Sequence, residues 1–310
     1  MKYLTSWKVK PLLFVADTVG SILHIFRKRK LPQNPKKVLF IRPEHIGDLI
    51  MATPTFETFK RNNPDCEVHV LCRSIAAPIL ANNPYVDLII EHDFPWMSFN
   101  YKSNLTQCTE KALVDLLKKE NYDIVFEMHG DIRNLRFASQ LKSFVIGYGC
   151  RGGGFYCNNM KQYNTEIKTI YQNLELIKDY GTMQFLIPQL WTPVTYGLKL
   201  PTDFIVINPT SGKKEKNLTD QEVIDIIETH KNDNIVLTGA QTDKDNNSKF
   251  EAYLNVTNLT GKTDLKQLIQ VVRRAKKVYC PDTGIMHIAN AVGIPCKAFF
   301  KTTDEKVWGY

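Results

Sequence analysis

The chain has 310 residues, of which 43% are hydrophobic and 23% are charged, a balance that is typical of a folded globular protein and excludes a disordered or fibrous one. Its length is sufficient for two domains of ordinary size. Seven cysteines, with no CxxC pair among them, argue against a disulfide framework or a zinc site and indicate structural thiols. The net charge of +8 comes entirely from residues 1–37, so the neutral remainder argues against a nucleic-acid-binding protein.

The N-terminal segment is basic and contains a periodic apolar stretch. Residues 11–26 read PLLFVADTVGSILHIF and are followed by the run RKRK at residues 27–30. The apolar positions recur at helical spacing, whereas the stretch is too short and too polar to span a bilayer, and no signal-peptide cleavage site follows. We expect an amphipathic helix that binds an anionic membrane surface through residues 1–30. The alternative is a helix docked on the protein's own surface.

From residue 37 onwards, apolar strands alternate with amphipathic segments. The pattern predicts strands at 38–42, 67–73, 86–93, 123–130 and 143–149, and helices at 47–63, 74–83, 109–122, 137–142 and 165–181. We expect Pro54 to break the first of these helices near its start. We also expect RGGGFYCNN, residues 151–159, to be a flexible loop.

A proline-punctuated connector at residues 187–201 is the predicted linker to a second alternating series. Strands are expected near 204–209, 234–239, 254–261, 276–281 and 294–300, with helices between them. The pattern indicates an α/β fold with parallel sheets covered by helices on both faces, and in such sheets ligands bind beyond the carboxyl ends of the strands. The predicted organisation is a basic tail at 1–36, an N-terminal Rossmann-like domain at 37–186, the linker, and a C-terminal Rossmann-like domain at 202–310.

The loop CPDTGIMHIANAVGIP at residues 280–295 predicts a phosphate site at a helix N-terminus. Asp282 and Thr283 suit the N-cap, Gly284 permits close approach of a ligand, and His287 on the first turn adds a possible donor. The alternative is an ordinary capped helix with a buried histidine.

The loop NPTSGKKEKNLT at residues 208–219 combines hydroxyl groups, backbone amides and lysines, as a diphosphate site requires. Its candidate residues are Thr210, Ser211, Gly212 and Lys216, and Thr238 and Gly239 add a further turn at a strand end. The alternative is a solvated lysine run. Neither GxGxxG nor GxxxxGK[ST] occurs, and the TDKDNN segment at 242–247 is interpreted as surface and not as a metal site.

Asp48 stands in the stretch FIRPEHIGDLIMATP, at the turn between the first strand and its helix. A carboxylate at this position can cap the helix or accept a proton from a substrate hydroxyl. The residue types alone favour the cap.

The motifs IRPEHIGDLIMATP, NPYVDLII, YDIVFEMHG, NPTSGKKEKNLT, NIVLTG, LTGKTDLKQLI and PDTGIMHIANAVGIP occur in this order. Together they resemble glycosyltransferase family 9, the family of the lipopolysaccharide heptosyltransferases, from about residue 37 to the C-terminus. The resemblance implies a GT-B fold, with two Rossmann-like domains facing across a cleft. It also implies inverting, metal-independent transfer from an ADP-heptose-type donor to a lipopolysaccharide-type or other glycan acceptor, with no cofactor.

The resemblance also implies roles for individual residues. Asp48 matches the proposed catalytic base, and Lys216 matches the lysine that contacts the donor phosphate. The donor-binding matches are Thr210, Ser211, Asp282, Thr283, Gly284 and His287. Glu127 stands where the family has an aspartate, and it is placed with His129 and Arg133 on the acceptor side.

In two places the chain departs from the family pattern: Leu218–Thr219 replaces a common Trp–Pro, and the donor domain ends at Tyr310, where relatives usually continue in a further helix. We expect a cytoplasmic enzyme, peripheral on the inner face of the cytoplasmic membrane, that acts on a glycan or glycolipid. The alternatives are a non-catalytic nucleotide-sugar-binding protein and a nucleotide-sugar epimerase of the same fold.

Overall fold

The computed structural model describes residues 4, 6–23, 29–97, 109–182, 186–193 and 197–310. Internal contacts divide the chain into two units. The first unit comprises Met1–Glu44, Ala52–Ala77 and Pro84–Leu186, and the second comprises His45–Met51, Pro78–Asn83 and Ile187–Tyr310. Parts of the predicted tail (1–3, 5 and 24–28) and of the predicted linker (194–196) lie outside the described residues.

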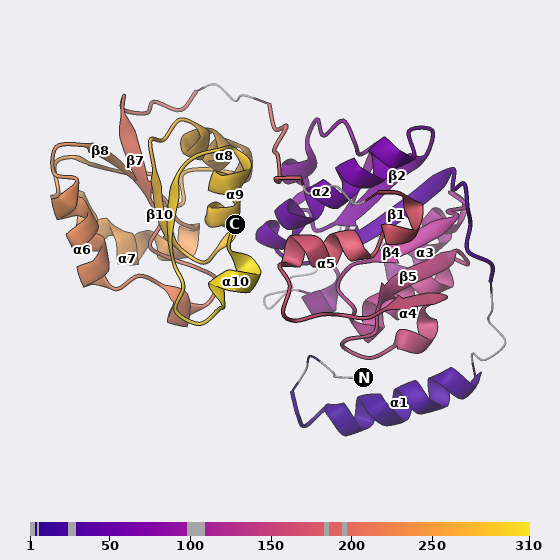
Figure 1. Ribbon diagram of the computed structural model, residues 1–310. Helices are drawn as coiled ribbons and strands as arrows, with labels where there is room; N and C mark the ends of the chain where they lie inside the picture. Colours follow the sequence, from indigo (N-terminus) through magenta and orange to yellow (C-terminus); the bar gives the residue numbers. More distant parts are fainter. Residues whose placement is uncertain (1–3, 5, 24–28, 98–108, 183–185, 194–196) are drawn as a thin grey trace. The chain divides into compact units, whose positions relative to one another are not determined.

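The first unit contains a six-stranded parallel sheet with the order β3-β2-β1-β4-β5-β6 (Figure 1). Its strands are β1 (Lys37–Arg42), β2 (Glu67–Cys72), β3 (Leu88–Glu91), β4 (Ile124–Glu127), β5 (Phe144–Tyr148) and β6 (Asn159–Lys161). Its α-helices are α1 (Lys10–Leu23), α3 (Glu110–Lys118), α4 (Ile132–Gln140) and α5 (Thr169–Glu175), and its 3₁₀ turns are η2 (Pro95–Met97), η3 (Gly154–Tyr156) and η4 (Lys178–Tyr180). Two elements are divided between the units: α2 (Ile46–Asn62) belongs to the first unit from Ala52 onwards, and η1 (Ala77–Leu80) belongs to it only at Ala77. The strand order reverses direction between β1 and β4, where open α/β sheets bind ligands beyond the strand ends.

The alternation of side chains along β1 explains why helices cover both faces of this sheet. Leu39 and Ile41 belong to a buried cluster with apolar residues of α3 and α4. Phe40 points the other way, stacks on Phe126 of β4 with ring centroids 4.6 Å apart, and meets the ring of Phe59 of α2 edge-on. Because β1 is buried on both faces, its sequence is a continuous apolar run.

The second unit contains a five-stranded parallel sheet with the order β11-β10-β7-β8-β9. Its strands are β7 (Phe204–Ile207), β8 (Asn234–Leu237), β9 (Val256–Asn258), β10 (Val278–Pro281) and β11 (Cys296–Phe299). Its α-helices are α6 (Asp220–Thr229), α7 (Lys244–Ser248), α8 (Leu265–Arg273), α9 (Gly284–Ala291) and α10 (Glu305–Trp308), and its 3₁₀ turns are η5 (Lys214–Lys216), η6 (Gln241–Asp243) and η7 (Lys249–Ala252). Figure 1 shows α6 and α7 on one side of this sheet and α8 and α9 on the other. The order reverses between β7 and β10, so the loops that follow these two strands flank the expected ligand position.

Local sequence signals fix the starts of two helices of this unit. Thr219 and Glu222 form a reciprocal capping box at α6, and Asp264 and Gln267 form another at α8. Each box satisfies backbone N–H groups that a helix N-terminus leaves without intrahelical acceptors.

Three sequence expectations are wrong in detail. Helix α2 runs through Pro54 without a break, because buried side chains on both sides, including Ile50 and Phe56, hold the helix together despite one missing hydrogen bond. The segment 151–159 is not an unstructured loop: it contains η3 and the start of β6, and the N–H of Val145 donates to Asn158 Oδ1 at 2.8 Å. The long helix expected at 165–181 is limited to α5 and a separate 3₁₀ turn.

Over the part of the chain that the structure describes, none of the helices combines the length and the apolar character needed to cross a bilayer.

Candidate active site

Lys216 and Asp282 bring together the two loops at the switch point of the second unit. Lys216 Nζ lies 2.7 Å from Asp282 Oδ2 and also donates to the Asp282 carbonyl oxygen at 3.2 Å. Both side chains are largely buried, and the hydroxyl group of Thr303 donates to the same carboxylate oxygen. Asp282 therefore holds the Lys216 ammonium group beside the first residues of α9, which follow at once in the chain.

The N-terminus of α9 is suited to an anion. Thr283 is the N-cap, but its backbone is extended and its side chain makes no capping hydrogen bond. Because the first N–H groups of a helix have no intrahelical acceptors and the helix dipole places positive charge there, a phosphate group is a favourable partner. Gly284 is the first residue of the helix.

His287 is buried, and burial lowers its pKa to about 4. The ring is therefore neutral at pH 7 and has one N–H to donate. Its Nδ1 atom lies 2.8 Å from the hydroxyl group of Tyr310. That contact orients the ring, whose other edge packs against the start of α2: a Cβ atom at Gly47 would lie 2.4 Å from His287 Cδ2 and 3.0 Å from Nε2.

The loop after β7 is organised by Thr210 and Asp243. Thr210 Oγ1 donates to Asp243 Oδ2 at 2.7 Å, and the N–H of Ala240 donates to the same oxygen at 2.9 Å. This carboxylate therefore ties the turn after β7 to the turn after β8. The predicted donor residue Thr210 is buried and has a structural partner in this contact.

The remaining predicted donor residues differ in accessibility. Thr238 is fully buried and donates to Asn208 Oδ1 at 3.3 Å, and Gly239 packs against Asn247, so both shape the loop base. Ser211 and Gly212 lie further out, and a Cβ atom at Gly212 would meet nothing within 4 Å. Room for a ligand group therefore exists at the tip of this loop and not at its base.

Asp48 lies on the first turn of α2, directly beyond the carboxyl end of β1. The backbone N–H of His45 donates to Asp48 Oδ2 at 3.2 Å. This contact fixes the carboxylate at the start of the helix, as the capping interpretation requires.

The residues expected on the acceptor side extend from the end of β4 to the first turn of α4, with His129 in the loop between them. Glu127 is completely buried and accepts hydrogen bonds from the N–H of Gly130 at 2.6 Å and the N–H of His129 at 3.1 Å. Burial raises its pKa to about 8. Glu127 can therefore act only through the loop that it holds. Arg133 is half exposed and forms an ion pair with Asp131 at 2.8 Å.

Sequence reasoning missed several residues that organise these loops. Asp243, Thr303 and Tyr310 each contact a predicted site residue from a distant part of the second unit. Glu44 of the first unit was missed in the same way, and its Oε1 atom lies 3.7 Å from Nε2 of the predicted site residue His129. Only Asp243 had a sequence signal, since it lies in the acidic TDKDNN segment.

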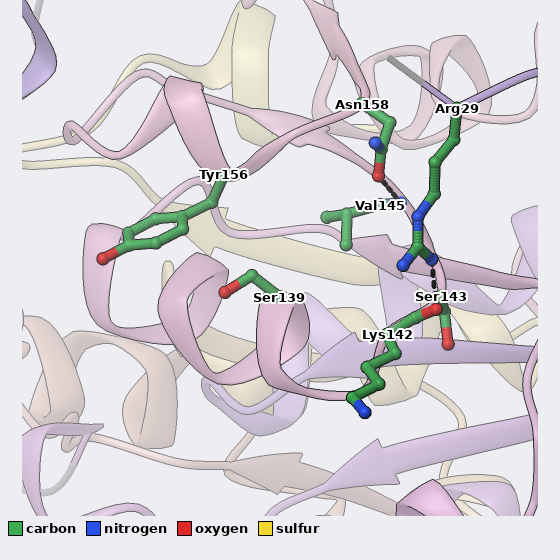
Figure 2. A pocket seen from close by; sticks show the side chains of 7 residues that line it. All are labelled: Arg29, Ser139, Lys142, Ser143, Val145, Tyr156 and Asn158. Atoms are coloured by element: carbon green, nitrogen blue, oxygen red, sulfur yellow. Dashed lines mark hydrogen bonds between the residues drawn. The ribbon is translucent and has the colours of Figure 1, made fainter. Parts of the chain in front are cut away.

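A shallow hollow in the first unit lies away from the strand ends that bind ligands in this fold. Figure 2 shows the Arg29 side chain above it, with the guanidinium group bonded to the carbonyl oxygen of Lys142. The lining residues are Arg29, Ser139, Lys142, Ser143, Val145, Tyr156 and Asn158. Lys142 and Ser143 precede β5, so the hollow opens at the amino end of that strand and not at the carboxyl end. Among the described residues, no group of three or more His, Cys, Asp or Glu side chains is placed to hold a metal ion.

Two parallel doubly wound sheets, each with a switch point in its strand order, are the architecture of the GT-B class of glycosyltransferases. The profile of glycosyltransferase family 9 (heptosyltransferase) matches residues 111–310. Lipopolysaccharide heptosyltransferase 3 of Escherichia coli is 24% identical over 298 residues, which cover 84% of this chain and 82% of the relative. The core heptosyltransferase OpsX of Haemophilus influenzae is also 24% identical, over 84% of this chain and 78% of its own.

Solved structures agree on the fold. E. coli ADP-heptose lipopolysaccharide heptosyltransferase II superposes with a TM-score of 0.74 at 18% identity, over 87% of this chain and 86% of that one. E. coli WaaC with ADP-2-deoxy-2-fluoro heptose gives a TM-score of 0.69 at 19% identity, over 86% and 90%. The chain belongs to glycosyltransferase family 9 and is a heptosyltransferase-like glycosyltransferase.

Proposed function

We propose that this enzyme transfers a heptose-type sugar from an ADP-heptose-type donor to a lipopolysaccharide-type glycan, with inversion at the anomeric carbon and without a metal ion. The observation that carries the proposal is the Lys216–Asp282 pair at the N-terminus of α9. The ammonium group, whose charge Asp282 partly offsets, and the helix N–H groups are expected to stabilise the charge of a diphosphate leaving group. The relatives' names support the choice of sugar and nucleotide.

In the proposed reaction, an acceptor hydroxyl oxygen forms a bond to the anomeric carbon while the bond between that carbon and the diphosphate breaks. The hydroxyl proton passes to the Asp48 carboxylate. The departing ADP takes the electron pair of the broken bond, and Lys216 with the α9 amides stabilises its charge. His287, neutral at pH 7, is expected to donate a hydrogen bond to the donor without adding charge.

The acceptor is expected to be a lipid-linked glycan at the inner face of the cytoplasmic membrane. An enzyme with this substrate has to work at an interface, and the basic N-terminal segment supplies charge for an anionic surface. Glu127 and His129 are expected to hold the loop that faces the acceptor, and Arg133 is expected to contact its anionic groups.

The substitution Asp48→Asn tests the proposed base. Asparagine retains an oxygen that can accept the His45 N–H, but it cannot take up a proton. We expect sugar transfer to fall by about 10² to 10⁴-fold, the range for loss of a general base, while ADP binding measured by calorimetry remains unchanged. Transfer at the parent rate in this variant would remove Asp48 from the mechanism.

A further inference from the structure

Helix α1 is attached to the first unit along one face only. Asp17 Oδ1 accepts the N–H of Gly153 at 2.7 Å, and a Cβ atom at Gly152 would come within 2.7 Å of Leu13. At Gly20, a Cβ atom would lie 2.5 Å from the ring of Phe155. Positions 13, 17 and 20 follow helical spacing, so they form a single stripe that packs against η3 and the glycines before it.

A second stripe of α1 is apolar and exposed. Leu12, Val15, Val19 and Ile22 are 70%, 58%, 51% and 66% exposed. Their spacings of three, four and three residues place them on one side of the helix, turned away from the stripe that contacts η3. Four adjacent aliphatic side chains that remain more than half exposed to water are unfavourable, because their apolar surface would gain from burial. A partner surface is therefore needed to explain this stripe.

The charges that flank α1 indicate what that partner is. Lys8 and Lys10 precede the helix, and the run at residues 27–30 follows it. Within this run, the Arg29 guanidinium group donates to the carbonyl oxygen of Lys142, so Arg29 is attached to the same unit as the helix (Figure 2). Cations at both ends of an apolar stripe match a surface that is apolar inside and negative outside.

We propose that the stripe Leu12, Val15, Val19 and Ile22 inserts into the interface of an anionic lipid bilayer, while Leu13, Asp17 and Gly20 keep α1 fixed to the first unit. The helix thereby binds the membrane in a fixed position on the first unit, and not through a flexible linker. It holds residues 152–156, in the connection between β5 and β6, at the membrane surface. The proposal extends the proposed function, which requires a lipid-linked acceptor, but membrane binding by itself does not depend on transfer.

A second copy of the chain is the competing occupant, and charge disfavours it. All of the net charge of +8 lies in residues 1–37, so two α1 stripes packed together would bring two strongly basic segments into contact. Such like charges repel, whereas an anionic bilayer attracts both.

The test uses the full-length chain and sedimentation with vesicles of phosphatidylglycerol and phosphatidylcholine. The variant Val15→Glu with Val19→Glu places two carboxylates on the stripe. The control, Thr18→Glu with Ser21→Glu, adds the same charge at two exposed positions of the same helix outside the stripe. We expect the stripe variant to bind at least about tenfold more weakly and the control to keep most of the parent affinity, because only the first places charge in the apolar layer.

Unchanged vesicle binding of the stripe variant would overturn the proposal. An equal loss of binding in the stripe variant and the control would also overturn it, because charge alone would then attract the protein to the vesicles. Sedimentation velocity without lipid provides the second measurement. A parent dimer that the stripe variant alone abolishes would assign the stripe to a second copy. Transfer to a soluble, delipidated acceptor is expected to be equal in parent and stripe variant, so a failure of membrane docking can be distinguished from a failure of the proposed reaction.

Discussion

At the scale of residues, the ion pair with Asp282 distinguishes Lys216, the proposed donor-binding lysine, from the other lysines of its loop. Lys213 and Lys214 are exposed, whereas Lys216 is partly buried and held by two contacts to Asp282. A buried ammonium group with a fixed position loses little entropy on meeting a phosphate, and its attraction is screened less than that of an exposed lysine. The run KKEK is therefore not a set of equivalent charges.

We expect Lys216→Met to weaken ADP binding by about tenfold to a hundredfold, because a hydrogen bond to a charged group contributes about 1.5 to 3 kcal/mol. Lys214→Met removes an exposed lysine from the same loop and is expected to leave the affinity almost unchanged. Lys216→Arg keeps the charge and is expected to recover most of the binding. Calorimetric titration with ADP measures the affinities, and thermal melts confirm that the variants are folded. Equal ADP affinities of the two methionine variants would contradict this assignment.

At the scale of elements, the loop between β4 and α4 depends on one buried carboxyl group. Glu127 accepts N–H groups from His129 and Gly130, and the side-chain amide of Asn134 donates to it at 3.2 Å. Gly130 has a positive φ of 77° and no room for a Cβ atom, since one would lie 2.5 Å from the carbonyl oxygen of Tyr148. The loop therefore has one conformation, and Glu127 fixes it at the expense of burying an ionisable group.

The burial of Glu127 makes the free energy of unfolding depend on pH. The pKa of Glu127 is raised from 4.5 to about 8, so between these values the folded state holds a proton that the unfolded state has lost. Stability therefore falls as the pH rises through this window, by up to about 1.4 kcal/mol per pH unit. The pKa of His287 is lowered from 6.5 to about 4, so this residue makes stability rise with pH, but only below pH 6.5.

Between pH 6.5 and 8, we expect the parent to lose unfolding free energy with rising pH and Glu127→Gln to lose clearly less. Urea unfolding at several pH values measures the difference, and exposed Glu166→Gln serves as the control. Parallel pH profiles for the parent and Glu127→Gln would show that Glu127 is ionised throughout and that its burial has no such effect.

The sequence was sufficient to predict the strands and the polar loops at their carboxyl ends, and insufficient to predict which distant residues contact those loops. Apolar runs such as residues 204–207 are read directly from the chain, and the polar residues at their ends identify the loops of Lys216 and Asp282. Thr303 and Tyr310 contact these loops only because the fold brings distant segments together, and no local pattern carries that information. Pro54 shows the reverse case, in which packing overrides a strong local signal.

At the scale of the whole molecule, charge and chemistry lie in different parts of the chain. The net charge of +8 belongs to residues 1–37, whereas the proposed donor-binding residues lie between 210 and 287. The family profile covers residues 111–310 and leaves the basic segment outside. The basic segment and the proposed donor-binding residues are therefore separate in the sequence.

The central claim is direct, inverting transfer of the sugar from an ADP-linked donor. The most direct measurement is an assay with the full-length chain, ADP-heptose and a lipopolysaccharide-core acceptor in the presence of excess EDTA, with the anomeric configuration of the product determined by NMR. The account predicts product formation at the same rate with and without EDTA, and a configuration opposite to that of the donor. A product that retains the donor's configuration, or transfer that stops when EDTA is added, would contradict it.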